Sequence, residues 1–216
     1  MTTNQIISYL KKQAVFSDKQ GMTRFGIDTR FALGVRIPVL RSLAKKLGRD
    51  HKLALELWKT KIHEARILAS MIDEFDKVTK KQMDSWIKGF NSWDICDQVC
   101  MNLFFNTPHA WSKVFEWVKK EKEFERRAGF ALMAVLAWKD KKAKDKDFLK
   151  FFPLIKKYSF DERNFVKKAV NWALRQIGKR NVFLRKQAIK TAKEILKMNT
   201  VKWIAKDALR ELKSKI

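Results

Sequence analysis

"FVKKAVNWALRQI", residues 165–177, is the stretch that decides the fold. Its apolar residues recur at spacings of three and four, which places them on one face of an α-helix. We expect this face to be buried, and its members are Phe165, Val166, Ala169, Val170, Ala173, Leu174 and Ile177. A second stripe of the same helix carries Lys168, Trp172, Arg175 and Lys179. The stretch therefore predicts a helix with one face in a core and a second, basic face.

The same spacing runs through nearly the whole chain, as in "LRSLAKKL" (40–47) and "RILASMI" (66–72). No period-two strand is evident, and only three prolines and seven glycines interrupt the chain, too few for a turn-rich β fold. Helix stops are expected at Gly48, Asn91-Ser92, Thr107-Pro108, Asp161 and Asn181, and Pro38 fits the first turn of a helix. These signals predict an all-α protein of about a dozen helices, each about 10 to 18 residues long.

Similar segments within the sequence suggest repeated structural units. "EARILASM" (64–71) resembles "RRAGFALM" (126–133), and "AVNWALRQI" (169–177) resembles "IAKDALREL" (204–212), an offset of 35 residues. That offset is close to the length of two-helix repeats, which stack into a continuous core and leave one concave face free. We predict one domain over residues 1–216, a helical-repeat superhelix (α-α solenoid); a compact irregular bundle is the alternative.

The charge is strongly positive and uneven. Lys and Arg number 48 against 23 Asp and Glu, a formal net charge of +25. Residues 1–108 hold 18 basic and 11 acidic side chains, whereas residues 109–216 hold 30 and 12. Such an excess destabilises the fold by self-repulsion, so a polyanionic partner explains it, nucleic acid first and an anionic membrane second. Well-solvated lysine-rich helices are the alternative.

Several other function classes find no support in the sequence. No stretch has the length of a membrane span, and the N-terminus lacks the apolar core of a signal peptide, so we expect a cytoplasmic protein. Cys96 and Cys100 fall on one helix face and should stay reduced. We predict no metal, because the histidines at 51, 63 and 109 have no paired spacing with these cysteines. Glycine-rich phosphate loops and GxSxG are missing, so neither a nucleotide cofactor nor triad hydrolysis is indicated.

"NSWDICDQVC", residues 91–100, concentrates polar chemistry in a short helix start. Asn91 or Ser92 fits the helix cap, and Asp94 in the first turn suits the helix dipole. Asp97 is not explained in this way, because it lies one turn beyond Trp93 on the same face. A catalytic carboxylate beside an indole and a structural carboxylate paired with lysine are both open.

Two further features remain ambiguous from the residues alone. Trp172 on its basic stripe fits either stacking on a sugar or base or packing against a neighbouring helix. Arg126 and Arg127 precede a small, apolar helix in which Gly129 permits close backbone approach. An arginine there either clamps a phosphate or is simply solvated.

Taken in order, the W-x-x-x-D, RR-A and K-A-x-x-W-x-L-R elements resemble the DNA alkylation repair family of AlkD-like glycosylases, which are similar to HEAT arrays. The resemblance covers most of the chain, from "FALGVRIPVLRSLAKKL" (31–47) through "SWDICD" (92–97) and "RRAGFALM" to "FVKKAVNWALR". It implies a HEAT-like superhelix with a basic concave face. It also implies a metal-independent glycosylase without a cofactor, which removes purines alkylated at N3 or N7 from double-stranded DNA without deep base flipping.

The resemblance also implies roles for particular residues. Asp97 is similar to the catalytic carboxylate, Trp93 and Trp172 to the aromatic walls of the cleft, and Arg127 to the arginine beside them, with Arg126 as the register alternative. DNA-binding roles are expected for Arg126, Lys168, Arg175 and Lys179. The family's N-terminal tyrosine has no equivalent here; the nearest residue is Phe25.

That departure keeps a second hypothesis open, a non-catalytic protein that binds the DNA backbone or distorted DNA. A helical scaffold for an acidic protein partner is the third hypothesis. We expect a monomer with no obligate protein partner and no membrane association.

Overall fold

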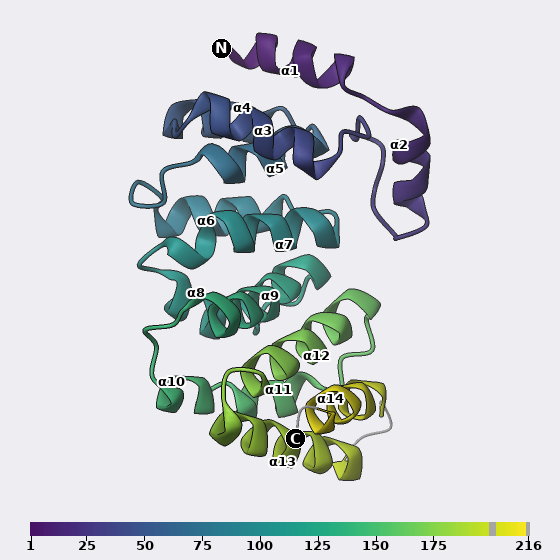
Figure 1. Ribbon diagram of the computed structural model, residues 1–216, viewed down its shortest axis with the longest axis vertical. Coiled ribbons are helices and arrows are strands. Elements are labelled where there is room, and N and C mark those ends of the chain that lie inside the picture. Colours follow the sequence, from purple (N-terminus) through teal and green to yellow (C-terminus); the bar gives the residue numbers. More distant parts are fainter. Residues whose placement is uncertain (199–201, 215–216) are drawn as a thin grey trace. The chain divides into compact units, whose positions relative to one another are not determined.

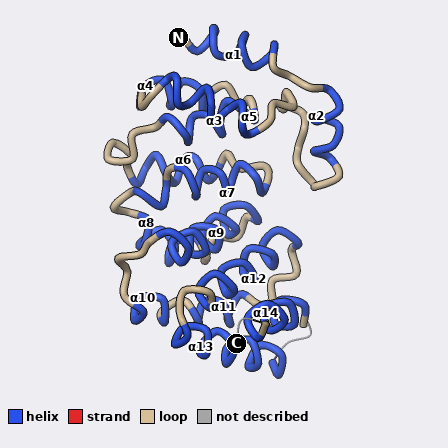
Figure 2. Tube along the Cα trace, in the orientation of Figure 1, coloured by secondary structure: helices blue, strands red, loops and turns tan. Residues whose placement is uncertain are grey.

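The computed structural model describes residues 1–198 and 202–214, which form α-helices, one short 3-10 helix and loops, with no strand in these ranges (Figures 1 and 2). The all-α prediction is confirmed. Several helices are shorter than expected, since the shortest, α10 (Asp145–Leu149), has five residues. None of the described helices combines the length and apolar content of a membrane span.

The chain divides into two compact units, Met1–His109 and Ala110–Ile216. The charge follows the same boundary, because the first unit carries 18 basic and 11 acidic side chains and the second carries 30 and 12. The second unit is therefore the stronger candidate for contact with a polyanion. The single-domain interpretation stays a prediction.

The first unit packs its helices around α5. It contains α1 (Thr3–Lys12), α2 (Phe16–Thr23), α3 (Ile37–Leu47), α4 (His51–Lys59), α5 (His63–Ile72), α6 (Lys80–Lys88), α7 (Trp93–Asn102) and η1 (Phe104–Asn106). Helices α1, α3, α4 and α7 all contact α5, which is buried over most of its length. As a result, α5 and α7 are held side by side in this unit (Figure 1).

Aromatic packing joins α4 to α6. The rings of Trp58 and Trp86 stack with centroids 4.1 Å apart and nearly parallel planes. Arg66 of α5 lies 4.9 Å above the Trp58 ring and donates a 2.8 Å hydrogen bond to the Gly89 carbonyl oxygen. Cation–π and hydrogen-bond contacts thus fix the segment that leads into α7.

The second unit packs around α9. It contains α8 (Ala110–Trp117), α9 (Glu123–Lys139), α10, α11 (Phe152–Tyr158), α12 (Asn164–Gly178), α13 (Val182–Met198) and α14 (Trp203–Lys213). Helix α9 is buried at every position from Ala128 to Ala137 and packs against α8 and α12. A helix that is apolar all round is expected at the centre of a core.

The sequence correctly predicted the helix faces that meet here. A β-carbon on Gly129 would lie 2.6 Å from the Val118 nitrogen, so only glycine allows α9 to approach the end of α8 so closely. The predicted stripe of α12 is buried from Val166 to Ile177, with Phe165 half-buried.

The predicted helix stops are also confirmed. Gly48 ends α3, Ser92 is the N-cap residue of α7, and Pro38 lies in the first turn of α3. Thr107 ends η1. Asp161 and Asn181 lie in the loops that flank α12.

Candidate functional site

The start of α7 places Trp93 and Asp97 one turn apart. Ser92 is in extended conformation at the N-cap position, so Trp93 is the first helical residue. The Trp93 indole is half-buried, and its Nε1 donates a 2.9 Å hydrogen bond to the Phe25 carbonyl oxygen. Asp97 is only 9% exposed. The helix therefore presents an aromatic ring beside a carboxylate that is largely removed from water.

Asp94 ties α7 to α5. Its Oδ2 lies 2.7 Å from His63 Nε2, and Ser92 Oγ donates to its Oδ1 at 2.6 Å. Burial by itself raises the pKa of Asp94, but the hydrogen bonds and charge of His63, with those of Ser92 and the Ile95 amide, outweigh burial and hold the pKa below its ordinary value. Asp94 thus does more than favour the helix dipole, because it joins two helices through a buried histidine.

Glu64, the next residue of α5, organises the loop before α3. Its carboxylate accepts hydrogen bonds from the backbone amides of Leu33, Gly34 and Val35, the shortest 2.7 Å long. Gly34 has φ +85°, and a β-carbon there would lie 2.4 Å from the Val15 carbonyl oxygen. Glycine is therefore required at this position, and the loop is held against α5 by charge-assisted hydrogen bonds.

A second polar cluster fixes the preceding loop. Asp28 forms a two-pronged ion pair with Arg30, 2.7 Å at its shortest, and accepts a 3.1 Å hydrogen bond from Asn91 Nδ2. The hydrogen bonds from Arg30 are the main reason why the pKa of Asp28 lies well below its usual range. Asn91 thus bridges to this loop and does not cap α7. Together with the bond from Trp93 to Phe25, it holds residues 25–30 beside the start of α7.

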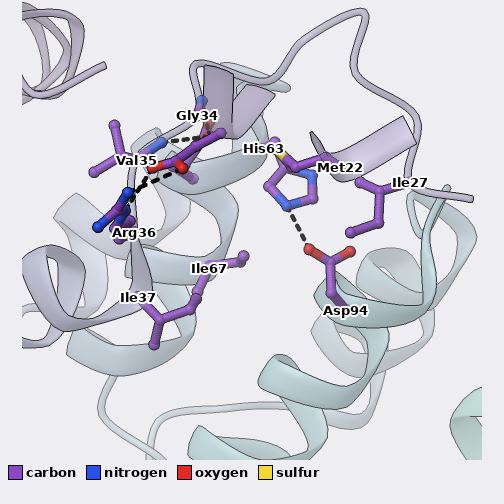
Figure 3. Close-up of a pocket in the computed structure, with 11 residues that line it drawn as sticks. Met22, Ile27, Gly34, Val35, Arg36, Ile37, His63, Ile67 and Asp94 are labelled. Atoms are coloured by element: carbon purple, nitrogen blue, oxygen red, sulfur yellow. Dashed lines mark hydrogen bonds and ion pairs between the residues drawn. The ribbon is translucent and has the colours of Figure 1, made fainter. Parts of the chain in front are cut away.

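A cavity of about 200 Å³ lies beneath this loop, between α2, the start of α3 and the His63–Asp94 pair (Figure 3). Its lining is mostly apolar, with contributions from Met22, Ile27 and Ile67. His63 is 3% exposed, and its Nδ1 has no hydrogen-bond partner among the described residues. Arg36 and Asp18, which form an ion pair, also line this cavity. The sequence analysis did not predict this pair, because His63 and Asp94 are 31 residues apart. The sequence indicated only that Asp94 lies in the first turn of a helix.

Arg127 and Arg126 begin α9 in the second unit and face different surroundings. Arg127 is buried, and its Nη1 donates a 2.6 Å hydrogen bond to the Phe165 carbonyl oxygen near the start of α12. Arg126 forms a 2.6 Å ion pair with Asp161, and its guanidinium lies 4.8 Å from the centre of the Tyr158 ring. Arg127 therefore ties α9 to the start of α12, whereas Arg126 belongs to a partly buried ion pair with Asp161.

The basic stripe of α12 is partly neutralised by α14. Arg175 and Lys179 both pair with Glu211, with Lys179 Nζ 2.9 Å from the carboxylate. Lys168 is exposed, and no described residue forms an ion pair with it. Trp172 lies between Lys168 and Arg175 in the sequence of α12, and its side chain is half-buried. Of the stripe, Lys168 is thus the cation most available to an external anion.

The four predicted catalytic residues form two pairs, one on each unit. Trp93 and Asp97 belong to α7 of the first unit, while Arg127 and Trp172 belong to α9 and α12 of the second. Cys96 and Cys100 are buried, reduced cysteines within the core face of α7. No group of three or more His, Cys, Asp or Glu side chains in the described part of the chain is arranged to hold a metal ion.

Comparison with known proteins points to one family. The family model described as DNA alkylation repair enzyme matches residues 6–212. A solved structure described as a new family of proteins related to the HEAT-like repeat DNA glycosylases with affinity for branched DNA structures is similar with a TM-score of 0.79. It is 21% identical, and the match covers 90% of this chain and 83% of that one. No curated protein sequence matches. The similarity confirms the predicted HEAT-like helical-repeat fold.

Proposed function

Because the chain belongs to the DNA alkylation repair enzyme family, we propose that it is a DNA glycosylase for cationic N3- or N7-alkylated purines. The observation that carries the proposal is the start of α7, where the largely buried Asp97 lies one turn from the half-exposed Trp93. A carboxylate in such a position stabilises positive charge more strongly than one in water does.

The chemistry requires a group that stabilises positive charge on a sugar. An N3- or N7-alkylated purine is cationic, so it leaves readily with the electron pair of the glycosidic bond and becomes neutral. Positive charge then builds on the deoxyribose ring, as in other glycoside hydrolyses. Asp97 stabilises that charge and orients a water molecule, whose oxygen bonds to C1′ while its proton is released to solvent. No step uses a metal or a cofactor.

The other site residues hold the DNA. In this proposal Trp93 of α7 forms an aromatic wall beside Asp97, where a cationic base gains cation–π attraction, and Trp172 of α12 supplies an aromatic surface in the second unit. We assign Arg127 and the cations Arg126, Lys168, Arg175 and Lys179 to contacts with flanking phosphates, a salt-dependent contribution that does not depend on base sequence. The net charge of +25 supports double-stranded DNA as the partner. We further propose that the protein acts in the cytoplasm as a monomer.

Base release from defined DNA tests the proposal. Wild-type protein and Asp97→Asn are incubated with duplex DNA that contains one N7-methylguanine, and free base is measured by chromatography. We expect Asp97→Asn to release base roughly 100- to 1,000-fold more slowly, the usual cost of removing an electrostatic stabiliser. Asp76→Asn is the matched control, because Asp76 is an exposed carboxylate of the same unit. Equal rates for wild type and Asp97→Asn, or no release by wild type, would exclude catalysis by Asp97.

A second candidate is binding of branched or distorted DNA without catalysis. Two observations favour it: the similar structure is described as having affinity for branched DNA, and the tyrosine of active relatives has no equivalent here. Phe25, the nearest residue, instead offers its carbonyl oxygen to Trp93. This candidate predicts tighter binding of a four-way junction than of linear duplex, with no base release from either.

A further inference from the structure

Helix α2 is unusual because it buries no residue. Every other α-helix in the described ranges contributes at least one buried side chain, but α2 contributes none. An isolated helix of eight residues is not stable in water, so tertiary contacts must hold it. They lie near its start, where Val15 donates to the Gly34 carbonyl oxygen at 3.3 Å and Asp18 pairs with Arg36 at 2.5 Å. The fold thus maintains a helix with one face against the protein and the other exposed to solvent.

The free surface of α2 combines an aromatic ring with a cation and polar groups. Phe16, Lys19, Gln20 and Thr23 have the spacing i, i+3, i+4 and i+7, so they share one helix face. The Phe16 ring is 74% exposed. Phe25 and Phe31 in the following loop are also exposed, at 67% and 52%. Exposed phenylalanines at three positions of one segment make this segment a candidate binding surface.

The same face of α2 borders a hollow that we name the α2 hollow. Its volume is about 410 Å³, and it is lined by Phe16, Lys19, Gln20, Thr23, Arg24 and Thr29. That volume falls in the range of about 300–1,000 Å³ that is typical of small-molecule sites. The lining provides a ring for stacking, two cations, and hydroxyl and amide groups for hydrogen bonding.

The charges around the α2 hollow favour an anion. No described residue forms an ion pair with Lys19 or Arg24. The nearby carboxylates of Asp18 and Asp28 are engaged by Arg36 and Arg30, whose hydrogen bonds lower the pKa values of both. The acidic groups of this segment are therefore ionised and already neutralised, which leaves Lys19 and Arg24 for an external phosphate.

We propose that the α2 hollow binds one unpaired nucleotide of a DNA strand. Its base stacks on Phe16, and its phosphates contact Lys19 and Arg24. Stacking on an aromatic ring next to cations is the usual mode of binding unpaired bases without sequence preference. The inference rests on the proposed function in so far as DNA is the partner, but it does not require Asp97 or base release.

Two DNA probes test this site. One duplex carries a single-nucleotide bulge of 2-aminopurine, whose fluorescence falls when it stacks; the other is fully paired and contains the same 2-aminopurine. We expect wild-type protein to bind the bulged duplex roughly 5- to 100-fold more tightly, from the usual contribution of one stacked base, and to quench its fluorescence. Phe16→Ala should abolish both effects and keep the affinity for the paired duplex.

Phe31→Ala is the matched control, because Phe31 is exposed in the same segment but does not line the α2 hollow. It should keep the preference for the bulge. Circular dichroism checks that both variants are folded, as expected for exposed side chains.

The possible results separate the two proposals. Equal binding of both probes by wild type, or an unchanged preference in Phe16→Ala, overturns the α2 hollow and leaves Asp97-dependent base release standing. Failure to bind either probe overturns the α2 hollow as a nucleotide site, whereas the glycosylase proposal is decided separately by base release from N7-methylguanine DNA. Phe16-dependent binding of phosphatidylserine vesicles with no preference for bulged DNA overturns the nucleotide site in favour of a membrane surface.

Discussion

Replacing Glu64 by alanine should detach the loop before α3 from α5. The carboxylate is the acceptor for three consecutive amides, and those of Gly34 and Val35 are buried. A buried amide without an acceptor costs about 1–3 kcal/mol, so the loss of both lowers the free energy of unfolding by about 2–6 kcal/mol. For a unit of about 100 residues, that corresponds to a fall in Tm of at least about 8 °C. Glu64→Gln keeps one acceptor oxygen without its charge and should lose roughly half as much.

Hydrogen exchange and thermal unfolding together test this reasoning. The amides of Leu33, Gly34 and Val35 should lose protection in Glu64→Ala before the rest of the first unit does. Glu56→Gln is the control, because Glu56 is an exposed carboxylate with one hydrogen bond, from Thr3 Oγ1. If Glu64→Ala shifts Tm by less than about 2 °C and these amides remain protected, Glu64 does not hold the loop.

Three further predictions concern Asp94, Gly129 and Glu211. The pKa of Asp94 is lowered in the fold. Its carboxylate therefore stabilises the protein above the unfolded pKa of about 3.9 and loses that effect as the pH falls through the folded pKa. Asp94→Asn should flatten the pH dependence of the free energy of unfolding below about pH 4, and an unchanged slope would refute this. Gly129→Ala places a methyl group 2.6 Å from the Val118 nitrogen and should lower the free energy of unfolding, measured by thermal unfolding, by about 1–3 kcal/mol. Gly21→Ala is the control: no atom lies within 4 Å of the added methyl group, so this variant should be neutral or stabilising. Glu211→Gln removes the ion-pair partner of Lys179 and leaves Arg175 only its 3.7 Å ion pair with Asp207. It should therefore strengthen DNA binding and steepen its salt dependence; unchanged affinity would remove Lys179 from the interface.

Local sequence signals predicted the helices well because their causes are local. The ends of α3 and the start of α7 follow from Pro38, Gly48 and Ser92, whose conformations are set within a few residues. The buried stripe of α12 follows from apolar spacing alone. Gly129 could be predicted as a point of close approach because a glycine within a small, apolar helix leaves room for a neighbouring backbone.

The polar part of the site depends on contacts between distant segments, so the sequence could not predict it. His63 meets Asp94 only because α5 packs against α7, and Glu64 meets its three amides only because Gly34 turns the loop back. In the same way, Arg175 and Lys179 look like free cations in the sequence, but the packing of α14 on α12 supplies Glu211. Lone charged residues on a helix face do not reveal which neighbour will neutralise them.

The exposed helix α2 has a consequence for divergence within the family. On most helices, packing in the core limits which side chains are tolerated. Helix α2 has no buried residue, so this limit is weak there. Substitutions at its exposed positions, such as Phe16, Gln20 and Thr23, cost the fold little, since surface changes usually alter stability by less than about 0.5 kcal/mol. If the α2 hollow binds a nucleotide as proposed, selection on α2 acts mainly through that ligand. On the proposed role of the α2 hollow, α2 is the segment to randomise when a different DNA preference is sought.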